Sequence, residues 1–178
     1  MGSPACTYEL LSHGANPNLV GPSQISPLMA HITSCTEPTT MSFELLIRYG
    51  AHLDPDMLFK AVAPRIRQGE LKTAFFLSKG IAPTITSAKW GMPLHQAVRS
   101  GKLGCVKPLL DAGADPTAKA TGKGFGKDKT PLEVAEQFYY QSLRDSIIDL
   151  IVAYITERSS LAKDRTEEGI IPPQNPTG

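Results

Sequence analysis

The chain has 178 residues, the length of one domain and enough to bury a substantial core. Hydrophobic residues make up 41% of it and its formal net charge is +1, so nothing general points to nucleic acid or an anionic membrane as a partner. The apolar runs are short and interrupted by charge, which predicts no transmembrane helix, and no apolar signal core follows residues 1–4.

The cysteines and histidines are scattered along the chain. Three cysteines without CxxC spacing argue against a disulfide framework and favour a reduced intracellular protein, cytoplasmic and/or nuclear. Cys35 and Cys105 are expected to be small core residues. Without clustered ligands, neither a metal site nor a cofactor is predicted.

In chain order, the first predicted helix covers residues 8–13 and ends at Gly14, with Pro17 preventing its continuation. Little precedes this helix, so the chain is expected to begin inside a repeated unit. The second unit opens at residues 26–30, where a serine N-cap precedes a proline. After a polar loop at 36–40, its second helix covers residues 43–49.

The third unit opens at residues 54–56, Pro64 interrupts it, and a helix over 71–79 closes it. The fourth unit, residues 92–116, is the clearest. After an enlarged loop at 119–129, the fifth unit opens at residue 130 and ends in the longest apolar stripe, a helix over 143–157.

The units recur at a nearly constant interval. The glycines that end helices, Gly14, Gly50, Gly80 and Gly113, are spaced 36, 30 and 33 residues apart. The leucines that start helices are spaced 30, 36 and 38 residues apart, at positions 28, 58, 94 and 132. Spacings that scatter about 33 residues are typical of a repeat protein.

The units resemble ankyrin repeats. The sequences at 92–97 (MPLHQA) and 130–135 (TPLEVA) are similar to the TPLHxA signature, and residues 109–116 resemble the end of the family's second helix. The resemblance implies an all-α solenoid that is irregular in its amino-terminal half. The predicted ankyrin-repeat domain is 1–158, with a half unit at 1–18, units at about 19–54, 55–86, 87–118 and 119–158, and a flexible polar tail at 159–178.

Pro108 departs from the repeat pattern, and His95 is a candidate for a catalytic role. Pro108 lies inside a predicted helix, where it removes a hydrogen bond. His95 is the only histidine at its motif position, and the resemblance implies that it forms a hydrogen bond between loops. A catalytic role for it would require a base or nucleophile that the sequence does not reveal.

The enlarged loop is the first candidate binding element. Its lysines (Lys119, Lys123, Lys127 and Lys129) are opposed only by Asp128, with Phe125 at the centre, which suits an acidic peptide or another anion. A solvated insertion explains the same residues equally well. The glycines at 122–126 do not complete a phosphate-binding loop.

Trp90 is the second candidate. With Lys89 it precedes the first helix of the fourth unit, and Arg99 ends that helix. A tryptophan here either anchors a partner or packs beneath a loop. Basic residues of the third unit (Arg65, Arg67 and Lys72) either extend the basic surface or form a solvated face.

We therefore predict a non-enzymatic protein-interaction module or adaptor that binds a partner protein, for example through an acidic segment, by its concave groove and loop tips. The predicted contact residues are Lys89, Trp90, Arg99, Lys119, Lys123, Phe125, Lys127 and Lys129. The alternative is a small enzyme or small-molecule-binding protein with a pocket between helices, in which His31, His95 or Glu133 carries protons.

Overall fold

The computed structural model describes residues 3–36, 38–88, 90–121, 127–137 and 141–167. This part of the chain forms nine α-helices and no strand, apart from two isolated bridges. The helices are α1 (Pro4–Ser12), α2 (Pro27–Ser34), α3 (Met41–Arg48), α4 (Asp56–Ala61), α5 (Gly69–Ser78), α6 (Pro93–Arg99), α7 (Leu103–Asp111), α8 (Pro131–Ala135) and α9 (Gln141–Glu167).

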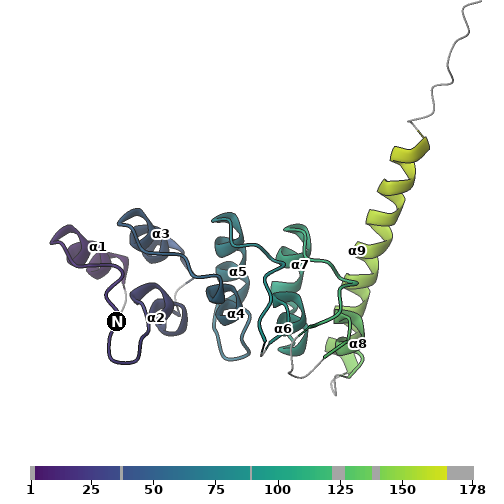
Figure 1. Ribbon diagram of the computed structural model, residues 1–178, viewed down its shortest axis with the longest axis horizontal. Helices are drawn as coiled ribbons and strands as arrows, with labels where there is room; N and C mark the ends of the chain where they lie inside the picture. The colour runs from purple at the N-terminus through teal and green to yellow at the C-terminus, as the bar shows by residue number, and fades with distance from the viewer. Residues whose placement is uncertain (1–2, 37, 89, 122–126, 138–140, 168–178) are drawn as a thin grey trace, which may run out of the picture.

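The helices lie in two rows (Figure 1). The inner helices α2, α4, α6 and α8 form one row, the outer helices α1, α3, α5 and α7 form the other, and the long α9 closes the carboxyl end. Each inner helix packs against the outer helix that follows it and against the next inner helix. This arrangement confirms the predicted all-α stack of helix pairs.

The inner helices begin where the sequence predicts. Proline is the first residue of α2, α6 and α8, where its missing N–H costs no helical bond. Ser26 Oγ accepts from the backbone N–H of Met29 at 3.2 Å. Thr130 and Glu133 form a complete capping box at α8, each side chain accepting from the other's backbone N–H.

The outer helices α1, α3, α5 and α7 share one ending. A glycine with φ between +85° and +97° follows each of them. The next residue then donates its backbone N–H to a carbonyl five positions earlier, as Ala51 does to Leu46 at 2.9 Å and Ala114 to Leu109 at 2.9 Å. The predicted helix-ending glycines are therefore confirmed in all four units.

The second and third units are joined by an aromatic cluster. Phe43 of α3 lies 5.7 Å from Phe75 and 5.6 Å from Phe76 of α5, between ring centroids, and His31 of α2 meets Phe43 edge-on at 4.8 Å. Phe43 and Phe76 are completely buried. Burial of side chains this large contributes about 1.5–3 kcal/mol each, so the stack continues through its least regular units.

Two lysines hold the long loops of these irregular units. Lys72 is 1% exposed, and its ammonium donates to the backbone carbonyls of Ile32 and Cys35, both at 2.8 Å. Lys102 donates in the same way to the carbonyl of Ile66 at 2.8 Å. Each lysine thus binds the loop that follows the inner helix of the preceding unit, where helical carbonyls lack partners.

The position of Lys72 corrects one expectation. The sequence placed Lys72 on a basic or solvated face with Arg65 and Arg67, but only the two arginines are exposed. Burial lowers the pKa of Lys72 because it penalises the charged amine. Its two carbonyl partners offset part of that cost.

The carboxyl end departs from the predicted boundary at residue 158. Helix α9 continues to Glu167, because residues 157–167 contain good helix formers and neither glycine nor proline. Tyr154 ties this helix to the preceding unit by donating its hydroxyl hydrogen to the carbonyl of Leu110. None of the described helices is long and apolar enough to cross a membrane.

Replacement of Lys72 by methionine should lower the free energy of unfolding by about 1–3 kcal/mol, because it leaves two buried carbonyls without a donor. Chemical denaturation monitored by circular dichroism measures this change. Lys60→Met on the exposed surface of α4 is the control and should leave stability almost unaltered. Equal stability of the two variants would contradict the role assigned to Lys72.

Candidate partner-binding site

Two neighbouring loops, called fingers here, form the site. Finger A is residues 81–92, between α5 and α6, and finger B is residues 114–130, between α7 and α8. They meet at Gly91 and Ala120. A Cβ built on Gly91 would lie 3.1 Å from the Cβ of Ala120, and Gly91 has φ +73°, so a larger residue here would strain both the backbone and the contact.

His95 holds finger B in place. Its Nε2 lies 2.9 Å from the carbonyl oxygen of Lys129, which assigns the proton to Nε2 as donor. The backbone N–H of Ala120 donates to the same residue, Lys129, at 3.0 Å. The family resemblance implied a hydrogen bond between loops for His95, and the observed bond joins helix α6 to the loop of the next unit, finger B.

Burial favours the neutral form of the His95 imidazole. Its side chain is almost completely buried, and burial lowers its pKa below the ordinary value because the imidazolium would lose its hydration. Hydrogen bonds with the backbone of Lys129 and Ala118 oppose this shift only partly. Protonation of His95 is therefore less favourable in the folded chain than in water.

Trp90 and Arg99 lie together. The guanidinium carbon of Arg99 is 5.0 Å from the centre of the Trp90 ring, within the range of a cation–π contact. Both side chains are half-buried. Trp90 comes from the end of finger A and Arg99 from the last turn of α6, so the pair lies where a finger joins the inner row.

The described lysines of finger B lie on the adjoining loop. Lys119 and Lys127 are exposed and Lys129 is half-buried. Lys127 forms an exposed ion pair with Asp128 at 3.7 Å. The pKa of Glu133 is lowered mainly by hydrogen bonds from Thr130, with smaller contributions from Lys119 and Lys129, because positive charges nearby favour the ionised carboxylate.

The structure thus brings five of the predicted contact residues to two touching fingers and one helix end: Trp90, Arg99, Lys119, Lys127 and Lys129. The other three, Lys89, Lys123 and Phe125, lie outside the described residues. The whole glycine-rich segment at 122–126 lies outside them too.

The predicted proton carriers belong to separate inner helices. His31 is in α2, His95 is in α6, and Glu133 is in α8. His95 and Glu133 each serve a structural hydrogen bond, to finger B and in the capping box. Among the described residues, no group of three or more His, Cys, Asp or Glu side chains is placed to hold a metal ion.

Two of the three cysteines are packing residues. Cys35 and Cys105 are buried, as predicted, and Cys6 is exposed. Burial is the main cause that raises the pKa of the Cys105 thiol, which makes the nucleophilic thiolate scarcer.

One feature of the outer row corresponds in part to the pocket between helices of the alternative prediction, but none of His31, His95 and Glu133 lines it. An elongated groove separates α7 from α9 on the outer row. The sequence predicts both helices. It does not predict the distance between them, because that distance depends on how α9 packs against the stack. Pro108 and Gly104, both in α7, are the sequence features that could have drawn attention to it.

Comparison with known proteins agrees with the repeat fold described above. The family model for the ankyrin repeat matches residues 92–121, which include α6, α7 and the start of finger B. No curated protein matches the chain significantly in sequence.

Solved structures also match. The crystal structure of the human ASB11 ankyrin repeat domain is similar with a TM-score of 0.65 and 24% sequence identity, and the match covers 86% of this chain and 64% of that one. The chain therefore spans less than two thirds of that domain. The chain has the fold of an ankyrin-repeat protein, and ankyrin repeats are generally protein–protein interaction modules.

The lowered pKa of His95 predicts that the stability of the fold depends on pH. Because the folded pKa of His95 lies below the unfolded value of about 6.5, the unfolded chain binds more protons between those two values. The free energy of unfolding should therefore fall as the pH drops below about 6.5, by at most about 1.4 kcal/mol per pH unit for this group.

Denaturation titrations of the wild type and of His95→Gln between neutral and mildly acidic pH measure this contribution. The variant should lose the part of the slope that comes from His95. A slope unchanged by the substitution would assign the pH dependence to other groups.

Proposed function

We propose that this chain is a non-enzymatic protein-interaction module whose contact surface is centred on Trp90 and Arg99 and flanked by the finger B lysines. The observation that carries the proposal is the Arg99–Trp90 pair, with 5.0 Å between guanidinium and ring centre. Tryptophan and arginine are the residues most enriched where binding energy concentrates. Their mutual contact orders both side chains before a partner arrives, which lowers the entropic cost of binding.

The supporting scaffold is rigid at this point. The Gly91–Ala120 contact joins the two fingers, and the His95–Lys129 bond fixes finger B to α6. Loops that a packed framework holds in place are common carriers of binding residues. The described residues of the two fingers are therefore held in place by these contacts.

The charge of the surface favours an acidic partner segment. The four cations Arg99, Lys119, Lys127 and Lys129 outnumber the three carboxylates of finger B and the start of α8, which are Asp115, Asp128 and Glu133. Asp115 is already bonded to Thr117, Asp128 is paired with Lys127, and Glu133 is engaged in its capping box. The positive excess attracts a negatively charged segment and speeds its encounter, increasingly so at low ionic strength.

Short random peptides displayed on phage, selected against the folded chain, test the proposal. Enriched peptides should be rich in Asp and Glu, and their affinity should fall as salt increases. Trp90→Ala should weaken the binding of a selected peptide by about 2 kcal/mol, about thirty-fold in Kd. Lys127→Glu and Arg99→Ala should weaken it as well.

The matched control for the lysine variant is Lys107→Glu, an exposed lysine on outer helix α7. It carries the same change in charge and should leave the affinity of the same peptide nearly unchanged. Selected peptides that bind Trp90→Ala as tightly as the wild type would refute this surface, provided that circular dichroism shows both proteins folded.

A further inference from the structure

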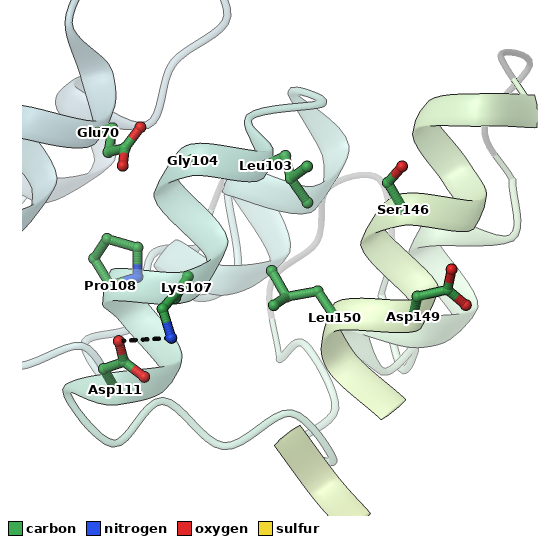
Figure 2. Close-up of a pocket in the computed structure, with 9 residues that line it drawn as sticks. All are labelled: Glu70, Leu103, Gly104, Lys107, Pro108, Asp111, Ser146, Asp149 and Leu150. Carbon is green, nitrogen blue, oxygen red and sulfur yellow. Dashed lines mark ion pairs between the residues drawn. The ribbon is translucent and has the colours of Figure 1, made fainter. Parts of the chain in front are cut away.

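A groove runs along the outer row between α7 and α9 (Figure 2). Two adjoining hollows with volumes of about 650 and 460 Å³ share three lining residues: Lys107, Asp111 and Leu150. They therefore form one elongated groove, called the outer groove here. It lies on the other row of helices from the Trp90–Arg99 surface.

The floor of the outer groove is apolar. Leu103 of α7 and Leu150 of α9 point into the space between the two helices, and Pro108 lines it as well. Leu110, Ala153 and Tyr154 continue this lining toward the end of α7. An apolar surface of this kind gains free energy when apolar side chains of a ligand displace water from it.

The rim of the outer groove carries an excess of hydrogen-bond acceptors. Glu70 of α5 and Asp149 of α9 both line this rim. Among the residues whose side chains the structure describes, no cation forms an ion pair with either of them. Of the two cations in the lining, Lys107 is already paired with Asp111 at 3.5 Å, and Arg158 lies 5.6 Å from the centre of the Tyr154 ring. The lining also contains a fourth carboxylate, Glu157, so its acidic groups outnumber its cations.

The backbone of α7 contributes one further acceptor. Pro108 has no N–H, so the carbonyl of Gly104, four residues earlier, lacks its usual helical donor. Glu70 lies directly over Gly104, because a Cβ on that glycine would come within 2.3 Å of the carboxylate. The Glu70 carboxylate therefore contacts α7 at the residue whose carbonyl lacks a helical donor, Gly104.

We infer that the outer groove is a second binding surface, and that it takes an amphipathic helix of a partner protein whose apolar side chains are flanked by lysine or arginine. The apolar floor accepts the helix's leucine-like side chains, and the acceptor-rich rim accepts its cations. On α9 the groove extends from Ser146 to Arg158, about 18 Å at about 1.5 Å per residue, which matches a helix of three turns.

A pair of designed peptides tests this inference. The probe is a leucine–lysine peptide with leucines at helical spacing, and the comparison is a leucine–glutamate peptide of equal length. The first should bind, with chemical-shift changes on α7 and α9 in nuclear magnetic resonance spectra, and the second should not. Absence of binding, or shifts confined to α6 and the fingers, would overturn the inference.

Charge-reversed variants locate the contact. The double variant Glu70→Lys, Asp149→Lys should raise the Kd of the leucine–lysine peptide at least tenfold. The matched control, Glu44→Lys with Asp145→Lys, makes the same change in net charge at exposed positions of α3 and α9 that do not line the groove. Equal weakening by both double variants would reduce the effect to general electrostatics and refute a specific site.

A steric variant gives a measurement that does not depend on charge. Ser146 is exposed and lines the groove, so Ser146→Trp should fill the groove and block the probe. Val152→Trp, at an exposed position of the same helix that does not line the groove, should leave binding unchanged. Trp90→Ala should also leave it unchanged, which separates this surface from the proposed acidic-peptide site.

Discussion

The fold depends on burial of apolar helix faces between neighbouring units. No helix pair is large enough to hide its own apolar side, so each pair is stable only when the next one covers it. The Phe43, Phe75 and Phe76 rings show this between α3 and α5. The hydrogen bonds between units follow the same logic, since they join residues about one repeat apart, as Asn18 and Gly50 do at 2.7 Å.

The two surfaces use this framework differently. The fingers are held by contacts between adjacent units, chiefly Gly91 with Ala120 and His95 with Lys129, so their side chains are placed by the stack itself. The outer groove lies between α7 and α9, where the two helices leave a hollow between them. One repeat framework therefore offers a basic surface and, on its other row, an apolar surface with an acidic rim.

The sequence predicted the repeat well because its signals are local. The spacing of Gly14, Gly50, Gly80 and Gly113 depends only on backbone conformation, and the proline starts of the inner helices are equally local. The same sequence could not reveal that Lys72 is buried or that Arg99 lies over Trp90, since both facts require the packing of separate segments. The sequence suggested a pocket between helices only as part of the alternative function, and it did not place that pocket between α7 and α9, for the same reason.

The loop lysines make the two ends of the stack different. Lys72 and Lys102 each reach backward, from a later unit to carbonyls of the unit before it. Removal of a later unit takes the ammonium donor away and leaves the carbonyls on the unit that stays folded, where water replaces the donor. Removal of an earlier unit leaves the lysine on the folded part, where its charge becomes solvated. The two ends of the stack therefore expose different polar groups when units detach.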